Sequence, residues 1–434
     1  MACVAGAALV LTAVFFYADF FHEWSNNFGT FYYAAKAMQA GGDIYASHAP
    51  GLKPDYVYPP LFAFLSLISL SVDLSVATRV WLAVDVLITW LALGLGAWEM
   101  IRRFQLPSGW PMGLLLASGA FLLSVGEVKT EWSTGQTDTL ILLAFVLALH
   151  WLDRAPVLAG LAVGFSANIK YQTLLALPWM IARRRWRAAG VTVLATLGFA
   201  SLPAVVSGWA GNLRNLKVAF AGLEAFVGVH SEAAAKTMNL AWIRSVSVTS
   251  AMGRLLELLH TNPARAFALS GLVAVLFLGI VWRIYRARSL DLFSPLPAAR
   301  ALAPPQPGIT ALEWVGLMVA WLVFGPEVSR RHMFVLLLLH LTVLAVLASP
   351  VVGFSRKPLV IGLIIWQIGL RLPPSHPAFF QSASDFWIGV GGPSWCLLFL
   401  YTTLLWSGLN WARHVRAASP LDNADRLQPR STSA

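Results

Sequence analysis

The chain alternates apolar runs of near-bilayer length with short polar segments, and this alternation limits its fold more than any other feature. A backbone inside hydrocarbon must satisfy its own hydrogen bonds, and runs of this length do so as helices. The sequence therefore predicts an all-α, polytopic membrane helix bundle with roughly twelve transmembrane helices. The expected spans lie near 3–19, 76–101, 111–126, 138–152, 156–168, 171–182, 187–207, 265–285, 309–325, 332–349, 358–371 and 389–411. Those at 156–168 and 171–182 are short, so we expect them to tilt or to pack inside the bundle.

Basic residues cluster beside the apolar runs, as at Arg102–Arg103, Arg183–Arg185 and Arg413 with Arg416. Such clusters favour the cytoplasmic side, which predicts that both termini are cytoplasmic. The loops 20–75, 127–137 and 208–264 then lie on the outer face. The net charge of +11 is explained by this topology and by anionic membrane lipids, so we expect no nucleic-acid partner. The two cysteines, in separate apolar runs, give neither a disulfide framework nor metal-ligand spacing, and no metal or cofactor is expected.

Composition shifts divide the chain into four expected parts. Residues 1–288 form an N-terminal membrane module, and the Pro/Ala-rich stretch 289–308 forms a cytoplasmic linker. Residues 309–417 hold the C-terminal transmembrane helices, and the polar stretch 418–434 is expected to be a disordered cytoplasmic tail. Within the first outer loop, the run 61–70 is too short to span a bilayer and is expected to lie as a helix at the outer interface, as is the amphipathic FYYAAKAM pattern.

Unusual polar residues concentrate in the expected outer loops. The stretch 21–60 is aromatic, polar and punctuated by Gly and Pro, EVKTEWSTGQT spans 127–137, and the turn GPEVSRRH lies at a membrane boundary. Lys170 interrupts two apolar runs at an outer turn. Acids and cations gathered on one face suit a site where an anionic, membrane-borne substrate meets a polar one.

Several of these segments resemble one known family. They are NFGTFYYAAKAMQAGGDIYA with DYVYPPLFAFL, then GQTDTLILLAFVLAL, then APVLAGLAVGFSANIKYQTLLALPWMIARRRWRA, and finally GPEVSRRH. In this order and spacing they resemble glycosyltransferase family 87, over roughly residues 1–350. The family comprises GT-C-fold mannosyltransferases that use polyprenyl-phosphate-mannose.

The resemblance implies transfer of a hexose, with mannose the expected sugar, from a polyprenyl-phosphate donor to a lipid or glycan acceptor. The reaction would be inverting and would take place on the outer face of a bacterial inner membrane. Such chemistry needs a carboxylate base near the acceptor and cationic donors around the leaving phosphate. The sequence shows no P-loop and no dinucleotide fingerprint, which agrees with a lipid-phosphate donor.

The sequence departs from the family pattern at the residue that matters most. The pattern places the catalytic Asp at the position of Asn27, and an amide cannot take up a proton at neutral pH. Three alternatives stay open: another acid such as Glu23, Asp19 or Glu131 serves instead, the register is shifted, or the chain is a catalytically silent, lipid-binding relative. Glu23 is the favoured substitute because it lies about one helical turn before Asn27.

The remaining candidates each have a functional and a structural interpretation. Lys170, Arg331 and His332 are expected to bind the donor phosphate, although such cations also snorkel at membrane boundaries. Tyr58 could stack on a sugar or belong to an interfacial aromatic belt. Glu131 and Asp138 could serve the site or satisfy a helix N-terminus, and Asn27 could cap a helix. For Asp43 the structural interpretation is favoured, and it is expected to be a turn residue. Asp85 is expected to lie far from the outer site.

A polytopic transporter or flippase is the alternative from another functional class. Transporters usually contain internal repeats and helices broken near the membrane midplane. No repeat of the YPPL or GQTD blocks occurs in the second half of the chain, and the polar residues lie in loops rather than in spans. The pattern therefore favours the glycosyltransferase.

Overall fold

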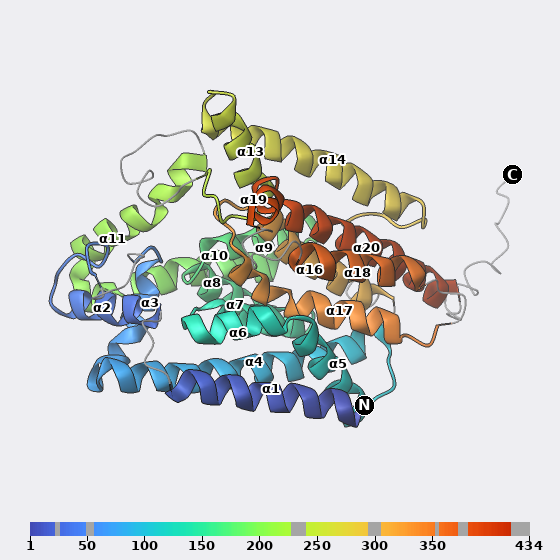
Figure 1. Ribbon diagram of the computed structural model, residues 1–434, viewed down its shortest axis with the longest axis horizontal. Helices are drawn as coiled ribbons and strands as arrows, with labels where there is room; N and C mark the ends of the chain where they lie inside the picture. Colours follow the sequence, from blue (N-terminus) through green and yellow to red (C-terminus); the bar gives the residue numbers. More distant parts are fainter. Residues whose placement is uncertain are drawn as a thin grey trace, which may run out of the picture.

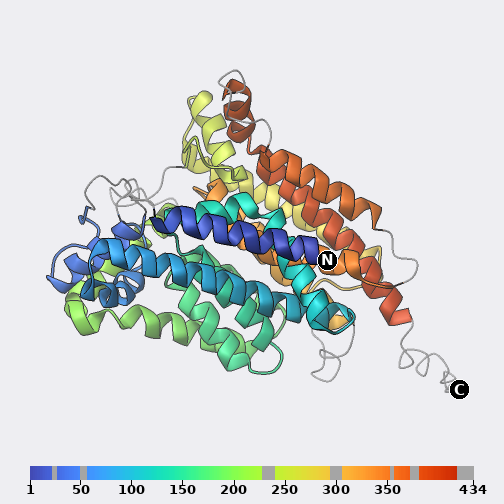
Figure 2. The ribbon, with the colours of Figure 1, turned by 60° about the horizontal axis from the view of Figure 1, so that its bottom comes forward.

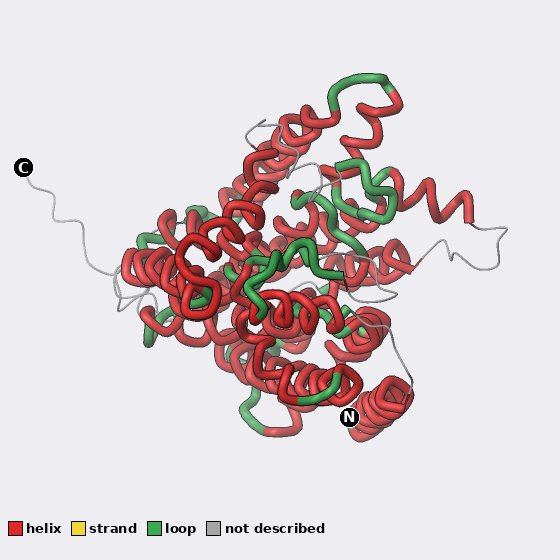
Figure 3. Tube along the Cα trace, turned by 90° about the vertical axis from the view of Figure 1, so that its left-hand side faces the viewer, coloured by secondary structure: helices red, strands yellow, loops and turns green. Residues whose placement is uncertain are grey.

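All regular secondary structure that the computed structural model describes is helical, which confirms the predicted fold class (Figure 1). The structure describes residues 1–21, 27–48, 56–226, 240–293, 305–351, 356–371 and 381–417. The long helices run roughly along the longest axis. Helices α2, α3 and α11 lie at one end, on the left in Figure 1, and the start of α1 and the end of α20 lie toward the other. Figure 3 looks onto the left-hand end, where helices and loops make up the described trace.

The helices of the first half of the chain are α1 (Ala2–Phe21), α2 (Phe28–Gln39), α3 (Pro60–Leu65), η1 (Ser66–Ser71), α4 (Leu74–Phe104), α5 (Trp110–Leu123), α6 (Val125–Thr134), α7 (Asp138–Trp151), α8 (Pro156–Ala167), η2 (Tyr171–Leu175), α9 (Ala176–Ala182), α10 (Trp186–Ser201) and α11 (Ala204–Phe226). Those of the second half are α13 (Val248–Leu258), η3 (Pro263–Arg265), α14 (Ala266–Arg286), α16 (Gln306–Phe324), η4 (Arg330–Leu336), α17 (Leu337–Ala348), α18 (Lys357–Arg371), α19 (Gln381–Gly389) and α20 (Gly392–Ala417).

Within the described parts of the chain, five helical segments are long and apolar enough to cross a membrane by themselves: α1, α4, α14, α16 and η4 with α17. The number rises to eight if each of three bent pairs counts as one span, with bends of 74° between α5 and α6, 103° between α10 and α11, and 58° between α19 and α20. Helices α1 and α4 run side by side in both Figure 1 and Figure 2. The chain is therefore a multi-pass membrane protein, but the expected count of roughly twelve spans is not confirmed.

Two of the expected loops contain more helix than the sequence suggested. The stretch 127–137 is helical as far as Thr134, and the turn begins at Gly135, whose φ of 60° lies in the left-handed region that glycine adopts without strain. The stretch 208–264 includes α13 and the part of α11 beyond the kink at Gly208. In the expected linker, α16 already begins at Gln306, whereas 294–304 and the tail 418–434 lie outside the described residues.

The first polar segment folds around a small aromatic core of its own. Phe28, Phe31 and Met38 form one buried face of α2, with the spacing of an amphipathic helix. The Phe31 ring meets the Phe62 ring edge-on, with 4.6 Å between the ring centroids. Tyr56 is buried, and its hydroxyl donates a hydrogen bond to the carbonyl of Pro59 over 2.6 Å. The helices expected on either side of Tyr56 are therefore present, and they pack on each other.

Helix α8 is short but packs closely against α10. A Cβ on Gly164 would lie 2.5 Å from the Cβ of Ala195, and one on Gly160 would lie 2.7 Å from the carbonyl oxygen of Ala188. Small residues four apart allow two helix backbones to approach this closely inside a membrane. The apolar stretch 156–168 therefore packs within the bundle, one of the two outcomes expected for a run of this length.

Buried ion pairs tie the helices together away from α2 and α3. Arg103 pairs with Glu99 and donates to the carbonyls of Leu149 over 2.6 Å and Pro307 over 2.9 Å, so it links α4, α7 and α16. Glu313 of α16 accepts hydrogen bonds from Arg183 over 2.7 Å, from Trp179 over 2.9 Å and from Tyr285 over 2.9 Å. Charges this deeply buried require such complete pairing.

Candidate active site

A buried ion pair joins two of the predicted site residues. Lys170, between α8 and η2, forms an ion pair with the first residue of α7, Asp138, and both side chains are almost fully buried. Burial, the largest single influence, lowers the pKa of Lys170, but Asp138, Tyr58 and Glu131 together outweigh it and the pKa is raised. Lys170 is therefore a fixed positive charge rather than a cation that snorkels to the surface.

Glu131 satisfies the N-terminus of α7. Its Oε1 accepts the backbone N–H groups of Asp138 over 2.8 Å and of Thr139 over 3.3 Å. The tight turn at Gly135 brings the last turn of α6 close to the first residues of α7, which makes this contact possible. Of the two interpretations of Glu131, the structure provides direct contacts for the helix-terminus role.

Tyr58, which belongs to the first polar segment, also contacts this cluster. Its hydroxyl donates to Oε1 of Gln136 over 2.9 Å, and Nζ of Lys170 lies 5.9 Å from the centroid of its ring. Burial raises the pKa of Tyr58, whereas the positive charges of Lys170 and Arg331 oppose that rise. The phenol therefore stays protonated beside the ion pair, with its ring against the ammonium group.

The position of the expected acid lies next to this cluster. The backbone N–H of Asn27 donates to the carbonyl of Thr134 over 2.9 Å, which attaches the start of α2 to the turn between α6 and α7. Asn27 stands at the N-cap position of α2, but its side chain makes no capping hydrogen bond. Glu23 lies outside the described residues. Asp43 is a turn residue, as expected, because its Oδ1 accepts the N–H of Tyr45 over 2.9 Å.

Helix η4 presents nitrogen groups that the described part of the chain leaves unsatisfied. Neither ring nitrogen of His332 has a hydrogen-bond partner there, although both are buried. Arg330 and Arg331 also have buried guanidinium nitrogens without a partner among the described residues. Lys170 and Arg331 are the charged neighbours of His332, and η4 packs against α6 and α7. Buried donors without partners are costly, and a bound anion would satisfy them.

The cluster also contains residues that sequence reasoning missed. Asp85 of α4, expected to lie far from the outer site, accepts a hydrogen bond at Oδ1 from the hydroxyl of Thr139 over 2.7 Å. That expectation is wrong because α4 packs along α7, which brings Asp85 beside the residue that follows Asp138. Gln136 was missed as well, and its only signal was its place in the GQTD block. Among the described residues, no three His, Cys, Asp or Glu side chains gather in a group that could hold a metal ion.

The family model of glycosyltransferase family 87 matches residues 56–303, more than half of the chain. The matched region contains Tyr58, Glu131, Asp138 and Lys170, whereas Asn27 precedes it and His332 follows it. No curated protein and no solved structure matches the chain. The match and the multi-pass helical fold agree with the resemblance drawn from the YPPL and GQTD segments, and the chain belongs to glycosyltransferase family 87.

Proposed function

We propose that this membrane glycosyltransferase transfers a hexose, with mannose the expected sugar, from a polyprenyl-phosphate donor to a lipid or glycan acceptor. The reaction is placed at the end of the bundle that carries α2 and α3, on the outer face of a bacterial inner membrane, with both termini cytoplasmic. Residues 1–288 would supply the donor and acceptor sites, and 309–417 would complete the bundle. The buried, unsatisfied nitrogens of His332 and Arg331 beside Lys170 carry this proposal.

These side chains suit a leaving phosphate. In an inverting transfer the acceptor oxygen attacks the anomeric carbon while polyprenyl phosphate departs, so negative charge grows on the phosphate oxygens. Arg331 and His332 would donate hydrogen bonds to that phosphate, and Lys170, in its ion pair with Asp138, would contribute a fixed positive charge. Donors held in place before the reaction stabilise the developing charge without reorganising. The ring of Tyr58 offers a surface on which a sugar can stack.

The mechanism also needs a general base that deprotonates the acceptor, and Asn27 at the expected position cannot serve as one. The sequence proposes Glu23 or Glu131 in its place, and Glu131 already accepts two backbone N–H groups of α7. A silent relative that binds the lipid donor without turnover is the second candidate function, favoured by the amide at Asn27. In that case Asn27→Asp alone would bring about transfer, because it returns a carboxylate to the position that the family pattern requires.

The test uses the full chain in detergent with polyprenyl-phosphate-mannose, and measures donor binding and sugar transfer separately. His332→Ala should reduce kcat by ~10²-fold or more, the scale of losing one charge-stabilising donor. Its ring nitrogens make no hydrogen bond within the described protein, so the variant should fold. Lys217→Ala, which removes an exposed cation from α11, is the matched control and should keep full activity.

The possible outcomes separate the candidate functions. Wild-type turnover together with loss in His332→Ala supports the phosphate site. Donor binding without turnover in the wild type supports the silent relative. Absence of both binding and turnover would refute the polyprenyl-phosphate proposal and favour the transporter. Unchanged kcat in His332→Ala would remove His332 from the site.

A further inference from the structure

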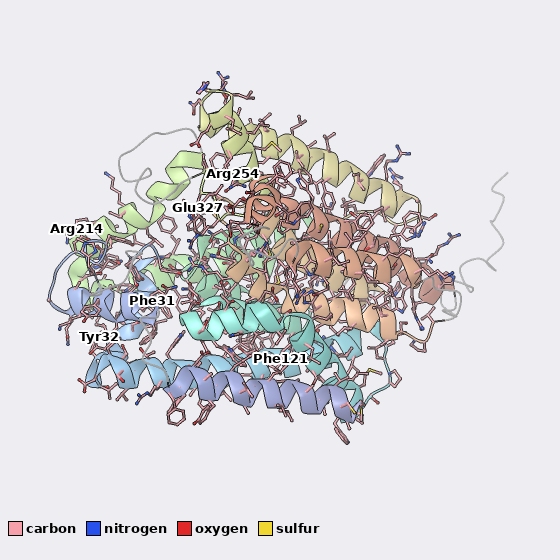
Figure 4. The ribbon with its side chains drawn as sticks, in the orientation of Figure 1. Phe31, Tyr32, Phe121, Arg214, Arg254 and Glu327 are labelled. Atoms are coloured by element: carbon pink, nitrogen blue, oxygen red, sulfur yellow. The ribbon has the colours of Figure 1, made fainter. Side chains whose placement is uncertain are left out.

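A cavity lies between the end of α4 and the start of α5, at the end of the bundle away from the candidate active site. Its volume is about 630 Å³, and its walls include Trp98, Arg102, Ser108 and Trp110. Helix α5 lies on the right in Figure 1, opposite α2 and α3, and Figure 4 labels Phe121 of α5 far from Phe31 of α2. The residues that line the cavity all fall between positions 94 and 113, so it is separate from the proposed phosphate site.

A glycine on each wall keeps this cavity open. A Cβ on Gly94 of α4 would meet no atom of the described chain within 4 Å. A Cβ on Gly113 of α5 would meet Cδ1 of Ile101 at 3.8 Å, which is ordinary van der Waals contact. The described side chains therefore leave the space beside both glycines to another molecule.

An exposed apolar stripe of α4 leads into the cavity. Leu87, Leu91 and Trp98 are all exposed, and their spacing of four and seven residues places them on one face of the helix together with Gly94. From Leu91 to Arg102 an α-helix rises by about 16 Å, close to the ~15 Å of hydrocarbon in one leaflet of a bilayer. A lipid tail can therefore lie along this face while its headgroup reaches the cavity.

Arg102 places a positive charge at the end of the apolar stripe. Its Nε donates to Oε2 of Glu99 over 3.2 Å, and its Cζ lies 5.9 Å from the centroid of the Trp98 ring. The bonds to Glu99 use Nε and Nη2. A guanidinium carries five N–H groups, so the Nη1 group of Arg102 can donate to a ligand in the cavity.

The ion-pair cluster behind Arg102 holds more positive than negative charge. Glu99 pairs with Arg102 and Arg103. Asp153 pairs with Arg103 and Arg185. Three arginines therefore share two carboxylates, and one positive charge is not compensated within this cluster. An anionic group in the cavity would compensate it, because Arg102 borders both the cluster and the cavity.

We infer that this cavity binds an anionic phospholipid of the membrane, whose phosphate accepts a hydrogen bond from Arg102 and whose acyl chain lies along the exposed face of α4. Basic pockets between transmembrane helices bind anionic headgroups in this way. Trp98 and Trp110 are exposed beside the cavity, as expected for tryptophans at the level of lipid headgroups. A small anion would use the positive charge but not the apolar stripe, so the two features together favour a lipid.

The test measures lipid binding to the full chain in detergent by native mass spectrometry, with phosphatidylglycerol and with zwitterionic phosphatidylcholine. The wild type should bind phosphatidylglycerol more tightly. Arg102→Gln should weaken phosphatidylglycerol binding about fivefold, the scale of one basic residue near an anionic surface, and leave phosphatidylcholine binding unchanged. Glu99 keeps Arg103 as its partner in this variant, which should therefore fold.

Gly94→Phe fills the space for the acyl chain and removes no protein contact. It should weaken the binding of both lipids about tenfold, the effect of displacing roughly two methylene groups from their contact. The donor Kd should stay unchanged in Arg102→Gln and in Gly94→Phe, because the candidate active site lies at the other end of the bundle.

Two substitutions in α14 are the matched controls. Arg286→Gln removes an arginine whose Cζ lies 5.5 Å from the centroid of the Trp282 ring, and Gly279→Phe adds a ring where no described atom lies within 4 Å. Neither residue lines the cavity, so both variants should bind both lipids as the wild type does.

Three results would overturn the assignment. The first is a wild type without preference for phosphatidylglycerol, and the second is an equal loss of binding in Arg102→Gln and Arg286→Gln. The third is displacement of phosphatidylglycerol by an equal concentration of polyprenyl phosphate, because the cavity would then belong to the donor lipid. None of these results bears on the proposed transfer reaction, which is measured separately.

Discussion

A larger side chain between α8 and α10 should both destabilise the protein and disturb its candidate site. Gly164→Ala puts a Cβ 2.5 Å from the Cβ of Ala195 and 2.9 Å from the backbone nitrogen of Thr196. A backbone atom cannot move aside as the end of a flexible side chain can, so α8 and α10 must separate. The C-terminal end of α8 leads to Asn168, whose Nδ2 bonds the carbonyls of Gly164 over 2.9 Å and Thr196 over 3.0 Å, and then to Lys170.

The size of the effect follows from two opposing terms. Overpacking a close-packed interface costs about 1–3 kcal/mol, and contact with backbone places this substitution near the upper value. Replacing glycine by alanine inside a helix contributes about 1 kcal/mol in the other direction. We therefore expect Gly164→Ala to lose roughly 2 kcal/mol of unfolding free energy. It should also lose transferase activity, because Lys170 is displaced from Asp138.

Gly198→Ala is the matched control, since Gly198 lies in α10 and no atom lies within 4 Å of the position that its Cβ would take. It should be neutral or more stable by up to about 1 kcal/mol. Unfolding in mixed micelles titrated with SDS and followed by circular dichroism measures both variants. Equal stability of Gly164→Ala and Gly198→Ala would show that α8 and α10 do not pack as closely as described.

Three further predictions concern topology, the buried ion pairs and the aromatic wall of the site. His48→Cys should react with an impermeant maleimide from outside the cell and Arg184→Cys only after permeabilisation; the reverse pattern would overturn the orientation. Glu313→Gln should cost about 3–5 kcal/mol of unfolding free energy, because it leaves the buried guanidinium of Arg183 without its counter-charge, and an unchanged Tm would refute this. Tyr58→Phe should cost about 1 kcal/mol through the lost bond to Gln136 and keep the donor KM, whereas Tyr58→Ala should raise KM; equal KM values would exclude stacking.

Local signals predicted the class of fold and much of its helical content. The apolar stretches that became α1, α4, α14 and α16 are recognisable because a span is defined by its own length and composition. The amphipathic FYYAAKAM pattern likewise predicted most of α2 from one segment alone. The ends of helices were harder to predict from the sequence. The polar stretch 127–134 reads as a loop, and it becomes α6 through packing against its neighbours.

The composition of the candidate site was predictable in part, but its pairing was not. Lys170 and Asp138 were each identified from sequence as polar residues at the edge of apolar runs, yet they are 32 positions apart and nothing local pairs them. Asp85 and Thr139 are 54 positions apart, and only the packing of α4 along α7 brings them together. From the sequence, Glu131 could serve either the site or a helix terminus. In the structure its Oε1 accepts the N–H of Asp138 at the start of α7.

The sequence alone determined that this chain lies in a membrane as a helical bundle and that its unusual polar residues gather in a few short segments, since hydrophobic length and local polarity are properties of short segments. Tertiary structure alone decided which acids hold the fold together, because Asp138, Asp85 and Glu131 meet partners that lie elsewhere in the sequence. Ion pairs and helix caps depend on where distant segments meet, and that meeting is set by the packing of the whole bundle.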